Sequence, residues 1–179
     1  MVKYVMEKFE KIDILINAAG FGIIAPSIVD IDNEEWDLIV NVNLKGAFNT
    51  SKAIVPFMKK QYGGRIINIS SMAGRTKSVI AGIHYTSAKA GLIGFTRHLS
   101  SELIRDNITV NAICPGVINT DLVQSQKTKR ELKDISESIP IGRLGETRDL
   151  IKGIKYLADF DNSYITGTCL DINGGLYMN

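Results

Sequence analysis

The chain has 179 residues, of which 45% are hydrophobic and 22% charged, and its 21 Lys and Arg against 19 Asp and Glu give a formal net charge of +2. This composition is that of one soluble globular domain. Opposite charges are interspersed except at Lys127, Lys129 and Arg130, so no nucleic-acid partner is expected. No apolar run approaches the roughly 20 residues of a membrane helix, and the start at Met1 is polar and amphipathic, which predicts a cytoplasmic protein with no membrane partner.

The first part of the chain alternates between helical patterns and short apolar runs. A helix is predicted over residues 2–9 and a buried parallel strand over residues 12–16. Asp32 followed by Glu35 has the spacing of a helix-capping pair, and apolar residues at helical spacing continue after it. The apolar run at residues 65–69 predicts a second buried strand.

The second part repeats this alternation. Apolar residues recur every three or four positions from near Tyr85 to Leu103, which predicts a long helix packed on a sheet. Strands are predicted over residues 108–114 and 169–172, with a helix over residues 147–158 between them. Short apolar runs separated by crossover helices are typical of an α/β fold with a parallel sheet.

The segment 119–140 is polar and has few large apolar residues. This composition predicts a mobile lid over a pocket. A solvated pair of surface helices is an equally good interpretation.

Three polar residues could together act on a carbonyl group. Tyr85 and Lys89 lie four apart on one predicted helix and so share a face, and Ser71 follows the predicted strand 65–69 at the sheet edge where ligands bind. A nearby ammonium lowers the pKa of a phenol, which would suit Tyr85 to exchange a proton, and Ser71 could hydrogen-bond the substrate oxygen. The hydride must come from a cofactor such as a nicotinamide, because no side chain supplies one.

Five motifs, in this order and spacing, resemble the short-chain dehydrogenase/reductase family: Asn17-Ala18-Ala19-Gly20, Asn43, Ser71, the run from Tyr85 to Lys89, and Pro115-Gly116. The resemblance covers essentially the whole chain. It implies an NAD(P)-dependent oxidoreductase whose residues 1–179 form one Rossmann-like domain, with a doubly wound, mostly parallel sheet.

The resemblance implies a role for each catalytic residue. Tyr85 would be the general acid in reduction and the general base in oxidation, and Lys89 would hold the nicotinamide ribose and tune Tyr85. Ser71 would orient the carbonyl. Asn43 would position a water for proton relay, and a local distortion of its helix is compatible with that role.

Other residues are implied to bind the cofactor, which is NADP or NAD, with NADP favoured by the resemblance. The segment 17–20 would line the adenine-ribose side of the cleft and stabilise its strand, and the segment after residue 114 would contact the nicotinamide side. Besides Tyr85 and Lys89, the implied set is Asn17, Ala18, Ala19, Gly20, Pro115, Gly116, Val117 and Thr120. No metal site is predicted.

Four reactive side chains are predicted to be structural. Cys114 and Cys169 lie in apolar, β-prone runs, where Cys usually behaves as a small buried hydrophobe. His84 and His98 do not fit the family's pattern and are predicted to be structural or surface residues.

The chain departs from the family at its start, where a Gly-rich βαβ unit is expected. The prediction is therefore a domain that lacks its first two βα units. The strand at residues 12–16 would then have an unpaired edge. NAD(P) would bind weakly or not at all, unless partner chains rebuild the site. A start codon assigned too far downstream and a genuinely shortened protein both remain open.

The C-terminal motifs at residues 142–145, 164–167 and 171–175 are similar to those of 3-oxoacyl-(acyl-carrier-protein) reductases. Reduction of a 3-oxoacyl thioester, small or carrier-bound, is the leading hypothesis. Alternatives are a dehydrogenase of a small alcohol, polyol or steroid, and a non-catalytic binding or assembly module. A homodimer or homotetramer is expected, in which Trp36, Ile93 and residues 176–178 could be covered. For Trp36 and Ile93, burial in the chain's own core is the alternative interpretation.

Overall fold

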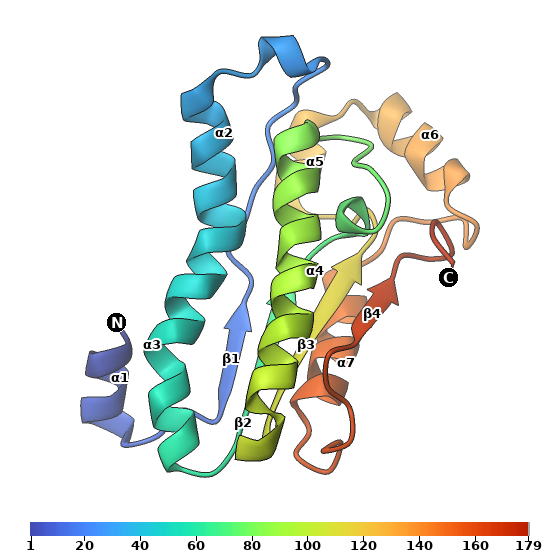
Figure 1. The fold of residues 1–179 in the computed structure, drawn as a ribbon. Coiled ribbons are helices and arrows are strands. Elements are labelled where there is room, and N and C mark those ends of the chain that lie inside the picture. The colour runs from blue at the N-terminus through green and yellow to red at the C-terminus, as the bar shows by residue number, and fades with distance from the viewer. Residues whose placement is uncertain (179) are drawn as a thin grey trace.

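A computed structural model describes residues 1–178 as a parallel four-stranded sheet flanked by helices (Figure 1). The strands β1 (Ile14–Asn17), β2 (Gly64–Ile69), β3 (Ile108–Pro115) and β4 (Cys169–Ile172) lie in this order across the sheet. Each pairs in parallel with the next. The predicted α/β, Rossmann-like architecture is confirmed.

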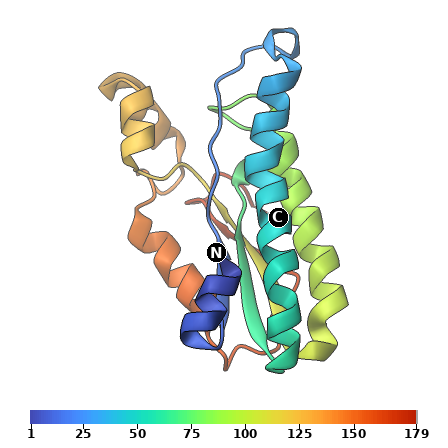
Figure 2. The ribbon, with the colours of Figure 1, turned by 90° about the vertical axis from the view of Figure 1, so that its left-hand side faces the viewer.

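Two long helical segments cover one face of the sheet. The first runs through α2 (Asn33–Val40), a π-helical turn η2 (Asn41–Lys45) and α3 (Gly46–Lys60), and the second is α4 (Ile83–Leu103). Figure 2 shows these segments side by side, with α7 (Thr147–Ala158) on the opposite face. The sheet therefore lies between two helical layers.

Side chains of the central strands alternate between two apolar layers. Ile66 and Val110 pack in a cluster with residues of α3 and α4, whereas Ile67 and Ile113 pack with Leu157 of α7. A strand buried on both faces needs apolar residues on both, which explains successive apolar residues such as Ile66-Ile67 in β2 and residues 112–114 in β3. Their prediction from the sequence is confirmed, with ends that differ by one residue.

The first strand is different because it forms an edge. It begins at Ile14, two residues later than predicted, and its alternate residues Ile14 and Ile16 are 39% and 43% exposed. Its neighbour is β2, and within residues 1–178 no strand pairs with its other side. The predicted open edge is present, and α1 (Val2–Phe9) lies beside it (Figure 1).

The polar segment after residue 118 forms two short helices, α5 (Asp121–Gln126) and α6 (Lys129–Ser138), beyond the carboxyl ends of the strands (Figure 1). The interpretation as a pair of surface helices is therefore confirmed. Movement of this pair as a lid remains a prediction.

Short 3-10 turns complete the connections at η1 (Ile28–Asp30), η3 (Met72–Gly74) and η4 (Ile104–Asp106). None of the helices described in residues 1–178 is both long and apolar enough to traverse a bilayer.

Residues predicted to be structural or to face a partner chain have different degrees of burial. Cys114 is buried, Cys169 is half-buried, and neither forms a disulfide. Ile93 is buried inside the chain, so its alternative interpretation as a core residue is confirmed. Trp36 and Met178 remain 37% and 78% exposed.

Candidate active site

A cavity of about 350 Å³ opens at the carboxyl ends of β1, β2 and β3. This is the edge at which open parallel sheets bind ligands. Its lining includes most of the predicted site residues: Ala18, Gly20, Ser71, Tyr85, Lys89, Pro115, Gly116, Val117 and Thr120. Asn17, Ala19 and Asn43 are not part of the lining.

Ser71, Tyr85 and Lys89 meet in this cavity as predicted. Ser71 leaves the end of β2 and caps the turn η3, where its Oγ accepts a hydrogen bond of 3.0 Å from the amide of Ala73. Tyr85 lies in the first turn of α4, and Lys89 follows one turn later with its Nζ 5.6 Å from the centre of the Tyr85 ring. The Lys89 ammonium donates to the carbonyl of Ile69 at 2.9 Å.

The predicted lowering of the pKa of Tyr85 by Lys89 is wrong for this structure. Burial raises the pKa of Tyr85, because an apolar environment disfavours the phenolate, and a hydrogen bond with Ser71 opposes this rise. Burial also lowers the pKa of Lys89 to about 8. The ammonium that was expected to stabilise the phenolate is itself poorly solvated and is directed towards a backbone carbonyl.

Asn43 lies behind the cavity in the π-helical turn, which is the helix distortion considered from the sequence. Its Nδ2 donates to the carbonyls of Phe21 at 2.8 Å and Ile39 at 2.9 Å, whereas its buried Oδ1 has no hydrogen-bond partner. A Cβ placed on Gly20 would lie 2.5 Å from this oxygen and 3.0 Å from Lys89 Nζ. The orphaned acceptor and the ammonium therefore both lie against Gly20, where the close packing leaves no room for a side chain.

Asn17 has a structural role next to the cavity. Its Oδ1 accepts from Thr50 at 2.6 Å and its Nδ2 donates to Asn68 at 2.8 Å, while Asn68 donates to Thr96 at 2.9 Å. This chain of hydrogen bonds joins α3, β1, β2 and α4. The predicted stabilisation of the strand by Asn17 has a direct basis here.

The opposite wall is built by the end of β3 and the start of α5. The Gly116 amide donates to Ile172 at 2.9 Å, and a Cβ at position 116 would lie 2.9 Å from the backbone of Asn173, so the close approach requires glycine. Thr120 caps α5. These residues leave backbone and hydroxyl groups at the cavity.

Several wall residues were not predicted from the sequence. They are mostly apolar and come from loops or from the faces of helices turned to the cavity: Gly22, Met72, Val79, Ile80, Leu122 and Leu150. Val79 and Ile80 form an apolar pair within an otherwise polar loop, which was the available signal. The histidines have no part in the cavity lining: His84 is fully buried and pairs with Glu35 at 3.0 Å, and His98 is exposed.

Comparison with known proteins agrees with this geometry. A family model described as enoyl-(acyl carrier protein) reductase matches residues 1–177. The 3-oxoacyl-(acyl-carrier-protein) reductases of Thermotoga maritima and Haemophilus influenzae are each 39% identical over 178 residues, which are 99% of this chain and 71% and 72% of those proteins. A solved structure described as ElxO with NADP bound has a TM-score of 0.90 at 33% identity, over 98% of this chain and 71% of the other. The chain belongs to the short-chain dehydrogenase/reductase family of NAD(P)-dependent oxidoreductases.

Proposed function

We propose that this chain reduces the 3-oxo group of an acyl thioester to a 3-hydroxy group with NADPH. The observation that carries the proposal is the pair of hydroxyls, Ser71 and Tyr85, placed in a cavity whose other walls are mostly apolar. A carbonyl oxygen can be held by the hydroxyls while an acyl chain occupies the apolar remainder. The names of the bacterial relatives and of the NADP-bound structure point the same way.

Tyr85 is the proton donor in this mechanism. Its raised pKa keeps the phenol protonated at neutral pH, so the proton is available to the carbonyl oxygen as charge develops there. Ser71 donates a hydrogen bond to the same oxygen and so orients the carbonyl. A nicotinamide, when bound, supplies the hydride to the carbonyl carbon.

Lys89 and Asn43 support proton transfer. The lysine ammonium would hold ribose hydroxyls. A relay that returns a proton to Tyr85 through a water on Asn43 would require Gly20 or Asn43 to shift, so that the buried Oδ1 opens to that water. The orphaned buried acceptor beside an ammonium is the feature that fits this part of the cofactor. The remaining contacts are assigned to the walls, from Ala18 and Gly20 on one side and from residues 115–117 and Thr120 on the other.

Cofactor affinity is expected to be low. The unpaired edge of β1 is where a further part of a doubly wound sheet would continue, so we infer that residues 1–178 provide the nicotinamide side of the cleft and only part of the adenosine side, at Ala18 and Gly20. Isothermal titration should therefore detect no micromolar binding of NADPH to the monomer. Micromolar binding would contradict this inference.

The substrate assignment is tested with a panel. NADPH at millimolar concentration, which compensates for weak binding, is combined with an acetoacetyl thioester, a steroid ketone and a keto sugar. We expect turnover of the thioester and none of the keto sugar, because the apolar walls give polyol hydroxyls few partners. Turnover of the steroid or sugar alone would refute the assignment, and no turnover of any would favour a non-catalytic module.

A further inference from the structure

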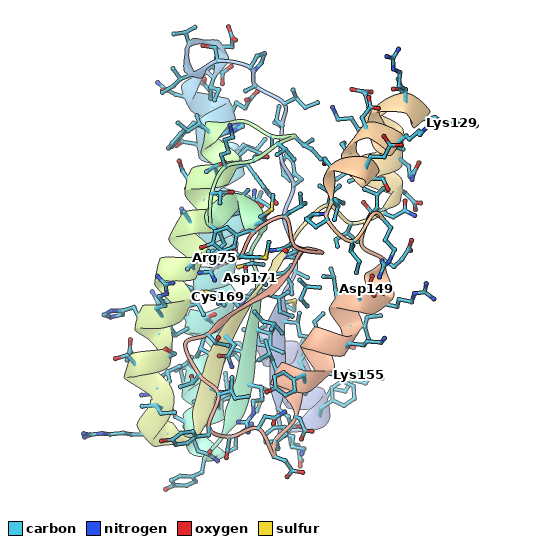
Figure 3. All side chains as sticks on the ribbon, turned by 90° about the vertical axis from the view of Figure 1, so that its right-hand side faces the viewer. Arg75, Lys129, Asp149, Lys155, Cys169 and Asp171 are labelled. Atoms are coloured by element: carbon cyan, nitrogen blue, oxygen red, sulfur yellow. The ribbon has the colours of Figure 1, made fainter. Side chains whose placement is uncertain are left out.

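An ion pair outside the cavity fixes the turn that carries Ser71. Arg75 and Asp171, 96 positions apart in sequence, form a forked contact in which Nη2 lies 2.6 Å from Oδ2 and Nε lies 3.2 Å from Oδ1. The two side chains are 10% and 20% exposed, and hydrogen bonding to the carboxylate raises the pKa of Arg75, so the guanidinium stays charged. Figure 3 shows them next to each other beside Cys169, at the β4 edge of the sheet.

The turn η3 is held from two sides. Ser71 begins it, and Arg75 follows its last residue, with the Arg75 amide donating to Met72 at 2.9 Å. Between them, Gly74 packs so closely on α4 that a Cβ would lie 2.7 Å from the carbonyl group of Lys89. The turn therefore contacts α4 through Gly74 and β4 through Arg75, and the position of Ser71 depends on both contacts.

Asp171 connects the ion pair to the wall of the cavity formed by Pro115 and Gly116, because it lies in β4, the strand that pairs with β3. Asp171 is in register with Cys114, and the next residue, Ile172, accepts the hydrogen bond from the Gly116 amide. Asp171 thus belongs to the strand that fixes the Pro115-Gly116 wall. The ion pair joins this wall to the turn of Ser71.

We propose that Arg75 and Asp171 are positioning residues, whose forked ion pair holds Ser71 in hydrogen-bonding reach of the Tyr85 hydroxyl. The proposal rests on the roles given to Ser71 and Tyr85 under the proposed function. Neither Arg75 nor Asp171 lines the cavity, so they act through the turn. A charged, two-bond contact fixes orientation as well as distance, which a single bond would not.

The test uses the full chain without cofactor or substrate. Tyrosines are labelled with ¹³C at Cζ, whose chemical shift reports hydrogen bonding of the phenol, and Tyr85→Phe identifies the Tyr85 signal among the six tyrosines. Ser71→Ala sets the size of the change when the hydrogen bond is lost. The variants are Arg75→Lys, which keeps the charge and loses the fork, Asp171→Asn, and the exchange of both residues, Arg75→Asp with Asp171→Arg. Lys59→Met is the control, because it breaks the Lys59–Asp106 ion pair of 2.8 Å away from the cavity.

Arg75→Lys and Asp171→Asn should each shift the Tyr85 signal in the same direction as Ser71→Ala, by most of the shift that Ser71→Ala causes. The exchange of both residues should return the signal to its position in the unmodified chain. Lys59→Met should leave the signal unchanged. The proposal is overturned if Ser71→Ala shifts the signal and the Arg75 and Asp171 variants do not, or if Ser71→Ala has no effect. Should Arg75→Lys not fold, the milder Asp171→Asn decides alone. A failed reductase assay leaves this result unaffected, since no reaction is measured.

Discussion

Two helices, α4 and α6, are held in place by different forces. α4 buries Ala88, Lys89 and Leu92 against the sheet, whereas no described residue of α6 is buried. α6 relies on local contacts, namely a capping box between Thr128 and Glu131 and ion pairs along its surface. The proposed proton donor thus lies on an element fixed by the core, whereas α6, none of whose described residues lines the cavity, can change in sequence or position at little cost to the fold.

The largest expected effect is on the α4 side. Tyr85→Phe removes the proton donor and should lower turnover of the acetoacetyl thioester by about 10²–10⁴-fold, the usual contribution of general acid catalysis. Steady-state rates at saturating thioester, with circular dichroism to confirm folding, check this. Tyr156→Phe, at a half-exposed position of α7, is the control and should retain full activity. Undiminished turnover by the Tyr85 variant would remove it from the mechanism.

Lys89 should make stability depend on pH. Burial lowers its pKa from 10.5 to about 8, so the folded state disfavours the ammonium, and stability is lost as the pH falls from about 10.5 towards 8. As the pH increases from about 8 to about 10.5, the free energy of unfolding of the unmodified chain should therefore increase by on the order of 3 kcal/mol relative to that of Lys89→Met. Urea denaturation at a series of pH values measures it. Parallel curves for the two proteins would show that Lys89 is well solvated.

The next largest effect on the free energy of unfolding is expected for the buried chain of hydrogen bonds next to the cavity. Asn68→Ala removes the 2.8 Å acceptor of Asn17 Nδ2 and the 2.9 Å donor to Thr96 Oγ1, and should lower the free energy of unfolding by about 2 kcal/mol. Asn33→Ala, at an exposed position of α2, should stay within about 0.5 kcal/mol of the unmodified chain. Equal effects of the two substitutions in urea denaturation would contradict the assigned role of this network.

The smallest effect is expected on α6. Thr128→Ala removes the capping box of α6 and should weaken that helix by about 1 kcal/mol without lowering the melting temperature of the whole chain. Faster hydrogen exchange confined to residues 129–138 is the expected signature. A cooperative loss of global stability would mean that α6 is part of the core after all.

The sequence predicts the elements well where burial imposes a period. β2, β3 and α4 have long apolar patterns because both faces of the strands and one face of the helix are buried. The interpretation of residues 119–140 stayed open because polar composition fits a lid and a surface helix pair equally well. The structure shows that the segment forms the two surface helices α5 and α6, and their movement as a lid stays a prediction.

The chemistry is predictable in part. Ser71, Tyr85 and Lys89 meet as expected, but the direction of the Tyr85 pKa does not follow from a Tyr-Lys spacing, because it depends on burial and on the turn of Lys89 towards Ile69. The pairing of Arg75 with Asp171 spans 96 positions and leaves no local pattern. Such contacts exist only once the strands are in register.

The central claim, that the cavity reduces a 3-oxoacyl group by hydride transfer with Tyr85 as proton donor, is tested most directly with NADPH deuterated at the transferred position. Mass spectrometry of the 3-hydroxyacyl thioester should find one deuterium at C3 in the product of the unmodified chain, and no product above background with Tyr85→Phe. Absence of labelled product from the unmodified chain, or equal labelling by both proteins, would contradict the account.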